Sequence, residues 1–115
     1  MLMLLSEPHY YRLQEAELIY FPQIFAADEG ARLLQQLQQT VHWTGRSLRL
    51  YGKEIAMPRL IAWYADPGIR YSYSGQTAEH NDWTPELQAI KPRIESLANA
   101  RFNSALLNYY RNGAD

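Results

Sequence analysis

The fold is decided by Ser104-Ala105-Leu106-Leu107-Asn108-Tyr109-Tyr110, an apolar run with the length of a β-strand. Successive side chains of a strand point to opposite faces, so Asn108 and Tyr110 share one face while Leu107 and Tyr109 share the other. So apolar a strand needs partners along its edges and cover on its faces. The preceding segments offer only a few short strands, and we therefore expect a fold that continues beyond the sequence given.

Two interpretations of the pair Asn108 and Tyr110 stay open. If their face points into the protein, the amide and the phenol hydroxyl can hydrogen-bond an acidic ligand. If the strand ends at the surface, the same side chains meet solvent, as polar groups at strand ends usually do. The strand pattern by itself favours solvent.

Upstream, residues 43–75 have the pattern of short strands separated by turns. We expect strands at Ser47–Tyr51, Leu60–Tyr64 and Arg70–Tyr73. Gly52-Lys53 suits a tight turn, and in Asp66-Pro67-Gly68 the proline presets the first corner while the glycine accepts positive φ at the second. The economical interpretation is two consecutive hairpins.

Two helices are expected on either side of these strands. Thr84 is a good cap with Pro85 at the first helical position, but Pro92 should kink or break that helix. The earlier helix begins near Asp28, after a short strand at Glu17–Phe21. The apolar faces consist of Leu33, Leu34, Leu37 and Val41 in the first helix and of Leu87, Ile90, Ile94 and Leu97 in the second.

Composition excludes several functions. A net charge of -1 argues against a protein that coats polyanions over its whole surface, so any nucleic-acid contact must be local. The absence of cysteine excludes disulfides, thiolate metal sites and cysteine nucleophiles. The apolar start, residues 1–5, is too short for a signal peptide or a spanning helix. We expect a soluble, cytoplasmic protein that does not enter membranes.

Aromatic residues suggest a stacking site. The chain has nine tyrosines, and Tyr71 and Tyr73 lie two apart on an expected strand, so their rings share a face. Two rings on one face can hold a planar base. The alternative is ordinary cross-strand aromatic packing, which the pattern alone favours.

A concentrated basic segment is the second candidate for substrate contact. It contains Arg46, Arg49, Lys53 and Arg59, with Glu54 as its single acidic residue. Tyr51 stands at the expected hairpin tip among these charges. Such a ring could wedge into a base stack while the cations hold phosphates, or the hairpin could simply be solvated.

His80-Asn81-Asp82 spells part of a non-haem iron site, but we do not assign it a metal. No histidine follows His80 to complete the ligand set, and the motif lies in the loop expected from Gln76 to Asp82. A polar loop that leads into the next helix is the better interpretation.

Four blocks of the chain carry a resemblance: Met57-Pro58-Arg59, Trp63-Tyr64-Ala65-Asp66-Pro67-Gly68, Tyr71-Ser72-Tyr73-Ser74-Gly75 and the stretch from Phe102 to Gly113. In order and spacing they are similar to the AlkB family, most of all to the branch that repairs alkylated bases in duplex DNA. The similarity covers residues 17 to 115.

The resemblance implies an α+β fold, in which a base-recognition lid of two helices and hairpins precedes a double-stranded β-helix (jelly-roll) core. Residues 1–16 would be an N-terminal segment, and residues 17–115 would be the lid with the first core strand of a truncated domain. The implied activity is DNA repair by oxidative dealkylation of damaged bases in DNA or RNA. Iron(II) and 2-oxoglutarate perform the oxidation in that family, while the protein places a flipped base.

Carried over by position, Asn108 and Tyr110 match the residues that bind the carboxylates of 2-oxoglutarate. Tyr71 and Tyr73, with Ser74 beside them, match the base pocket. The same positions emerged from strand alternation alone.

The resemblance also implies contacts to the nucleic acid. Leu50, Tyr51 and Gly52 match the hairpin finger that fills the gap left by an extruded base. Arg59 matches a basic residue near the flipped nucleotide.

The sequence departs from the family pattern at its end. The family's iron-binding His-x-Asp is expected a few residues after Gly113, so we expect no catalytic or metal-ligating residue in this chain, no complete binding of either cofactor, and no turnover by the chain alone. A second hypothesis is a non-catalytic nucleic-acid-binding or interaction module. A reading frame that encodes Gly-x-His-x-Asp beyond Asp115 would support the enzyme. The expected partner is alkylated DNA or RNA, and the exposed core strand could also pair with another chain.

Overall fold

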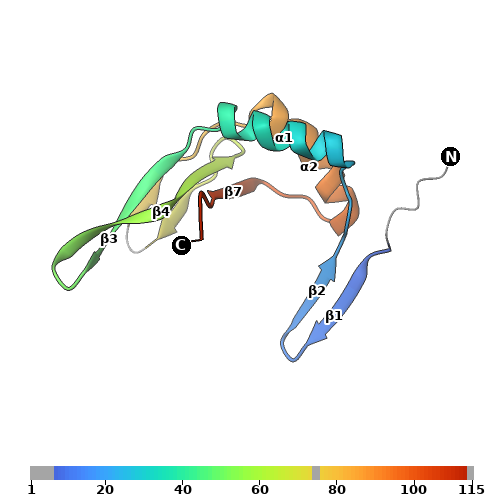
Figure 1. Ribbon diagram of the computed structural model, residues 1–115, viewed down its shortest axis with the longest axis horizontal. Coiled ribbons are helices and arrows are strands. Elements are labelled where there is room, and N and C mark those ends of the chain that lie inside the picture. Colours follow the sequence, from blue (N-terminus) through green and yellow to red (C-terminus); the bar gives the residue numbers. More distant parts are fainter. Residues whose placement is uncertain (1–6, 74–75, 114–115) are drawn as a thin grey trace. The chain divides into compact units, whose positions relative to one another are not determined.

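A computed structural model of the protein describes residues 7–73 and 76–113, whose course is shown in Figure 1. The described residues form two helices and small antiparallel sheets, which is a mixed α+β arrangement. The chain divides into two compact units, residues 1–38 and 39–115, and each is described by itself.

The first unit is a β-hairpin followed by a helix. β1 (His9–Leu13) and β2 (Ala16–Tyr20) pair antiparallel, and α1 (Ala27–Thr40) follows. Sequence patterns predicted β2 and the helix but not β1. Both strands are exposed along their whole length, and the sequence of β1, His9-Tyr10-Tyr11-Arg12-Leu13, does not alternate between apolar and polar residues, so no strand pattern revealed it. The β1–β2 hairpin spans residues 9–20, so it includes the expected boundary between residues 16 and 17.

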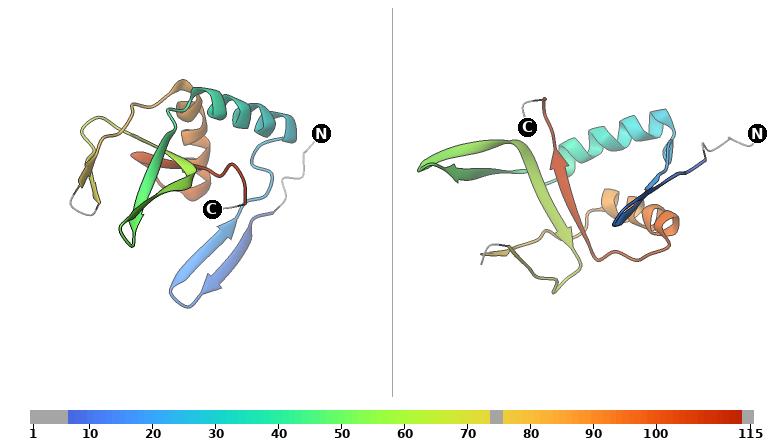
Figure 2. Two further views of the ribbon diagram at one scale, coloured as in Figure 1. Left: turned by 60° about the vertical axis from the view of Figure 1, so that its left-hand side comes forward. Right: turned by 90° about the horizontal axis from the view of Figure 1, so that it is seen from below.

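The second unit is built on a three-stranded antiparallel sheet. Its strands are β3 (Thr44–Leu50), β4 (Lys53–Ala65) and β7 (Ser104–Tyr109), in the order β3-β4-β7. The long β4 is therefore central, and β7 lies along its second half, as the right view in Figure 2 shows. The apolar run near the C-terminus is a strand, as predicted, but the expectation of a buried strand from Phe102 to Tyr110 is wrong: from Ala105 to Tyr109, β7 alternates half-buried and exposed residues.

An irregular stretch interrupts the pairing of β3 with β4. The register shifts between Gly45 and Ser47, so that Arg46 alone stands against residues 57–59 of β4. Pro58 lies in this stretch, where regular pairing with β3 is already interrupted, so its missing N–H removes no hydrogen bond between the two strands. Its carbonyl oxygen accepts two hydrogen bonds from Arg111, from Nε at 3.1 Å and from Nη2 at 2.8 Å.

Two details of the strand region differ from the prediction. The β3–β4 turn is centred on Tyr51 and Gly52, at φ 52° and 75°, and not on Gly52-Lys53. The second expected hairpin is wrong, because β4 pairs with β7, while β5 (Tyr71–Tyr73) pairs with β6 (Gln76–Ala78). The apolar β7 pairs six residues with β4, whereas β5 has only three to offer.

The second helix, α2 (Pro85–Ala98), starts where the sequence indicated. The Thr84 hydroxyl oxygen accepts a hydrogen bond from the Leu87 N–H at 3.3 Å. The expected break at Pro92 does not occur, and the helix is continuous. Pro92 removes one helical N–H without ending the helix. The helix ends seven residues later at Asn99, which takes the left-handed conformation and donates its N–H to the Glu95 carbonyl.

The buried core of the described residues is small and lies around β4. Its members are Val41, Ala62, Tyr64, Ala65 and Leu87. The Tyr64 hydroxyl accepts a hydrogen bond from the His42 N–H at 2.9 Å, which ties the segment after α1 to the sheet. Among the helices of the described residues, none has the length and apolarity needed to cross a membrane.

Candidate functional site

The open face of β7 carries the predicted cofactor ligands. Asn108 lies opposite Ile61, and Leu106 lies opposite Trp63, so these four side chains share one face of the sheet. Tyr110 follows one residue past the end of β7. Leu106 is 64% exposed, Tyr110 is 58% exposed, and Asn108 is exposed as well. The structure thus places Asn108 and Tyr110 together, on a face that is open in the described part of the chain.

The opposite face of β7 is covered. The ring of Trp43 meets that of Tyr109 edge-on, with centroids 5.3 Å apart and planes at 77°. Tyr64, on the same face of β4, is buried. The side of β7 that carries Leu106 and Asn108 is therefore exposed in the described part of the chain, whereas the other side is packed.

The hairpin tip brings the predicted finger residues together. Leu50 is the last residue of β3, and Tyr51 and Gly52 form the two-residue turn. Tyr51 is fully exposed and has a positive φ, which is uncommon for a bulky residue. In Figure 1 the two strands run out beyond the rest of the sheet to this turn. The tip therefore presents a protruding and fully exposed aromatic ring.

Basic side chains flank the tip. Arg49 pairs with Glu54 across the hairpin, and Leu50 pairs with Lys53. Arg49 and Lys53 therefore lie in the last two residue pairs before the turn. All three charged side chains are exposed. Arg59 differs, because it is half-buried in the irregular stretch of β4. Tip cations can hold phosphates, whereas Arg59 has a more enclosed position.

The predicted base pocket lies on a separate element. Tyr71 pairs with Ala78 and Tyr73 pairs with Gln76 in the two-stranded sheet of β5 and β6. Ser74 lies outside the described residues. The candidate groups in the described residues thus occupy four places in the second unit: the hairpin tip, the irregular stretch of β4 with Arg59, the open face of β7, and β5.

His80 and Asn81 have structural contacts. Asn81 bridges to Tyr64 of β4 in parallel, and the His80 ring meets the Trp63 ring edge-on at 5.4 Å. The described residues contain no group of three or more histidine, aspartate or glutamate side chains that could hold a metal ion. These residues do not fit an iron centre, and no step through iron is assigned to them.

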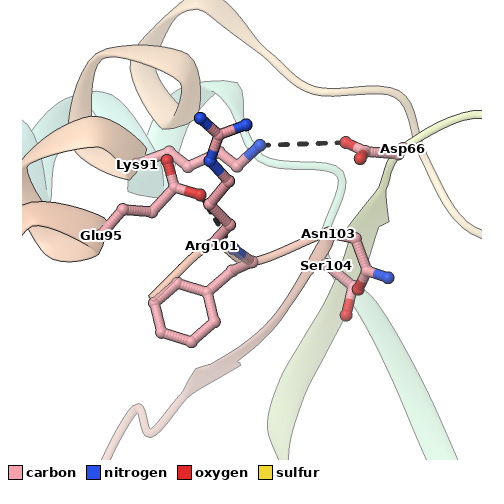
Figure 3. A pocket seen from close by; sticks show the side chains of 7 residues that line it. Asp66, Lys91, Glu95, Arg101, Asn103 and Ser104 are labelled. Atoms are coloured by element: carbon pink, nitrogen blue, oxygen red, sulfur yellow. Dashed lines mark hydrogen bonds and ion pairs between the residues drawn. The ribbon is translucent and has the colours of Figure 1, made fainter. Parts of the chain in front are cut away.

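A cluster that sequence patterns missed joins α2 to the end of β4. A pocket there is lined by Asp66, Lys91, Glu95 and Arg101, among others (Figure 3). The indole N–H of Trp83 donates to Asp66 Oδ1 at 2.6 Å. The signal that could have found this pair is weak: the family-like block that ends in Asp66-Pro67-Gly68, and a tryptophan just before a helix cap.

Comparison with known proteins decides the family. The family described as the 2OG-Fe(II) oxygenase superfamily matches residues 17–115. The chain belongs to it. Among AlkB-family relatives, the DNA oxidative demethylase ALKBH2 of Homo sapiens is 33% identical over 95 residues, which are 80% of this chain and 36% of that protein.

Other relatives agree on the AlkB family. The ALKBH2 protein of Mus musculus is 32% identical over 80% of this chain and 40% of its own length. The alpha-ketoglutarate-dependent dioxygenase alkB homolog 3 of Homo sapiens is 38% identical over 83% of this chain and 33% of its own length. This AlkB-family chain therefore spans about a third to two fifths of the length of the relatives that it matches. The described residues form no closed jelly roll.

Proposed function

We propose that residues 17–115 are the nucleotide-recognition lid and the first core strand of an iron(II)- and 2-oxoglutarate-dependent dioxygenase that dealkylates damaged bases in DNA or RNA. One observation carries the proposal: Asn108 on the open face of β7 and Tyr110, one residue past the strand, are both exposed in a chain of the AlkB family. An amide N–H and a phenol O–H both donate hydrogen bonds to carboxylate oxygens. That pair suits a small dicarboxylate such as 2-oxoglutarate.

The division of labour follows from the residues present. In the whole enzyme, iron and 2-oxoglutarate supply the oxidation of the alkyl group. Asn108 and Tyr110 bind and orient the 2-oxoglutarate carboxylate through directed hydrogen bonds. The described residues contain no group of three or more histidine, aspartate or glutamate side chains that could hold a metal ion, and no role in metal binding is proposed for them.

The nucleic acid is held by the second unit's projecting hairpin. Tyr51 at the tip fills the space that an extruded base leaves in the stack, while Arg49 and Lys53 contact phosphates on either side. The extruded base stacks on Tyr71 and Tyr73 of β5. A rigid two-residue turn suits a wedge, because little conformational freedom is lost when it enters the duplex.

A second candidate function is a non-catalytic nucleic-acid-binding module. It is favoured by the hairpin itself, which carries its fully exposed ring and its cations on one continuous pair of strands. The two candidates differ in one respect. The module needs only the hairpin, whereas the enzyme also needs the open face of β7.

The decisive experiment changes Tyr110 in the protein encoded by the whole reading frame that contains these residues. Tyr110→Phe removes one hydrogen bond to a carboxylate, so KM for 2-oxoglutarate should rise roughly tenfold. Tyr109→Phe is the matched control, since its ring packs against Trp43 on the covered face. Equal KM values for Tyr110→Phe and the wild type would remove Tyr110 from the cofactor site, and absence of any 2-oxoglutarate-dependent turnover would favour the module.

A second experiment tests the wedge. Tyr51→Ala should lower activity on duplex DNA more than on single strands, because only the duplex has a gap to fill. Tyr10→Ala, in an exposed tyrosine of β1, is the control. Equal losses on both substrates would refute the wedge.

A further inference from the structure

The chain leaves β4 after Ala65 and returns at Asn81 to the edge of the same strand. Asn81 donates its backbone N–H to the Trp63 carbonyl at 2.8 Å, and the Ala65 N–H donates to the Asn81 carbonyl at 3.1 Å. The Asn81 side-chain amide donates to the same Trp63 carbonyl at 3.1 Å. Asn81 thus takes the edge of β4 beyond the point where β3 pairs with it, and residues 66–80 form a closed excursion that carries β5 and β6.

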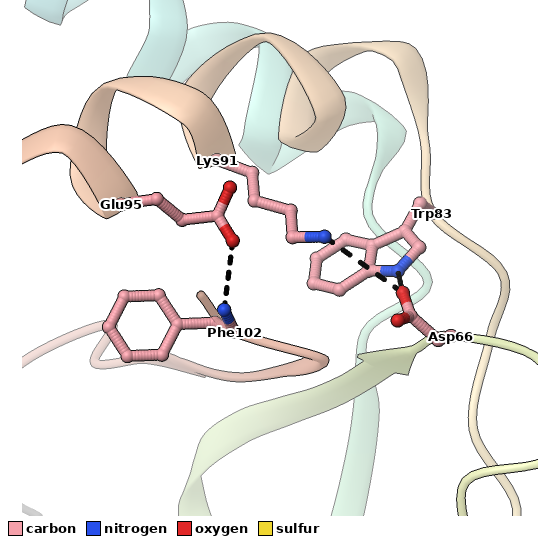
Figure 4. Close-up of polar contacts among 5 residues, drawn as sticks. All are labelled: Asp66, Trp83, Lys91, Glu95 and Phe102. Carbon is pink, nitrogen blue, oxygen red and sulfur yellow. Dashed lines mark hydrogen bonds and ion pairs between the residues drawn. The ribbon is translucent and has the colours of Figure 1, made fainter. Parts of the chain in front are cut away.

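A second tie closes the excursion with side chains. The indole N–H of Trp83 donates to Asp66 Oδ1 at 2.6 Å, a short bond of the kind that a carboxylate acceptor strengthens. Lys91 of α2 lies over the Trp83 ring, with Nζ 5.1 Å from the centroid, and is 4.0 Å from the same Oδ1 (Figure 4). The Lys91 ammonium group therefore contacts both Trp83 and Asp66.

Helix α2 also contacts the segment that precedes β7, through a hydrogen bond that does not involve the excursion. Glu95, four residues after Lys91, accepts a hydrogen bond from the Phe102 N–H at 2.8 Å, as Figure 4 shows. The Asp66 N–H donates to the Asn103 carbonyl at 2.9 Å. The start of the excursion is therefore fixed both to α2 and to the segment that leads into β7.

The strand pair β5–β6 depends on these ties. Within the residues that the structure describes, β5 and β6 pair only with each other, over three residues each. So short an isolated pair is marginally stable in water. Its place relative to the main sheet is therefore set by the two stems of the excursion.

We propose that Asp66 and Trp83 are positioning residues, which clamp the stems of the excursion and thereby set where Tyr71 and Tyr73 meet the flipped base. This inference rests on the proposed function for the role of the tyrosines, but the clamp itself does not. Asp66 and Trp83 act through the backbone of β5 and touch no substrate.

The clamp is tested first on the chain of residues 1–115, without substrate. Nitrogen-15 labelling of tryptophan gives an indole N–H resonance for Trp83, which the short bond to Asp66 should shift downfield and protect from solvent exchange. Asp66→Asn should abolish the shift and accelerate amide exchange in β5 and β6 roughly tenfold. Trp83→Phe, which keeps a ring beneath Lys91, should accelerate the same amides.

Glu95→Gln is the matched control for Asp66→Asn. It is also a carboxylate-to-amide change on the α2 side of the cluster, but its partner is Phe102 and not the excursion. It should leave exchange in β5 and β6 unchanged. Unchanged exchange in both Asp66→Asn and Trp83→Phe would overturn the clamp.

The positioning role is tested by turnover in the protein from the whole reading frame. Asp66→Asn should raise KM for the alkylated base roughly tenfold, with KM for 2-oxoglutarate unchanged, and Asp66→Glu should restore part of the loss. Faster exchange in β5 and β6 with an unaltered KM for the base would overturn the positioning role. If the wild type fails to dealkylate any base, the proposed function fails, while the exchange data still decide the clamp.

Discussion

The rings of Trp43 and Tyr109 meet edge-on, with centroids 5.3 Å apart. This contact defines which face of β7 is packed within the second unit. Leu107 and Tyr109 turn toward the packed side, and Leu106, Asn108 and Tyr110 turn to the open side. The polar pair that we assign to 2-oxoglutarate thus lies next to an exposed leucine, Leu106.

Leu106 reports whether that face is covered in a longer protein. In the chain of residues 1–115, Leu106→Ser should change the free energy of unfolding by less than about 0.5 kcal/mol, because the side chain is already exposed. In the protein from the whole reading frame, the same change should cost about 2 kcal/mol or more. Urea unfolding measures both. Leu107→Ser, on the packed face, should destabilise both proteins, and a small effect of Leu106→Ser in both would contradict a covered face.

Tyr51 should lower the stability of the chain while it contributes to the affinity for nucleic acid. Its φ of 52° is unfavourable for a bulky side chain, and asparagine tolerates that conformation better. Tyr51→Asn should raise the free energy of unfolding by up to about 1 kcal/mol while duplex affinity falls. Tyr51→Phe, which keeps both ring and φ, is the control for stability. A Tyr51→Asn chain that is less stable than the wild type would show that the tip is not strained.

Two glycines should respond to alanine in opposite ways. Gly30 lies inside α1, where an added Cβ would stand 3.8 Å from the Cβ of Phe25, an ordinary contact. Gly30→Ala should therefore stabilise the chain by about 0.5–1 kcal/mol. Gly52 has a φ of 75° with open space around it, so Gly52→Ala should cost about 1 kcal/mol from backbone conformation alone. Thermal unfolding measures the melting temperature of each variant, which should rise for Gly30→Ala and fall for Gly52→Ala. Melting temperatures that shift in the same direction would contradict the backbone conformation described for one of the two glycines.

Thr84 anchors the start of α2. Its hydroxyl oxygen accepts the Leu87 N–H, so Thr84→Ala should lower the free energy of unfolding by about 1 kcal/mol. Thr84→Ser retains the acceptor and should recover most of the loss. Chemical denaturation compares the three chains, and an equal loss for serine and alanine would assign the effect to the methyl group and not to the cap.

Local chemistry allowed several elements to be predicted from the sequence. Thr84 followed by Pro85 indicates a helix start whatever surrounds it, since a cap and a preset φ act within one turn. The alternation in residues 104–110 placed Asn108 and Tyr110 on one face for the same local reason. The expected turn at Gly52-Lys53 was one residue out of register, because the turn type depends on φ at Tyr51, which sequence propensity disfavours.

The sequence by itself determined which segments become strand or helix near the C-terminus and which side chains share a face. Only the tertiary structure decided that β4 takes β7 as its partner, that Asn81 completes the edge of β4, and that Trp83 closes on Asp66. Those contacts join residues that are far apart in the chain. Strand periodicity encodes which face a residue occupies, whereas the choice of partner depends on how well whole surfaces pack, and that is settled only when they meet.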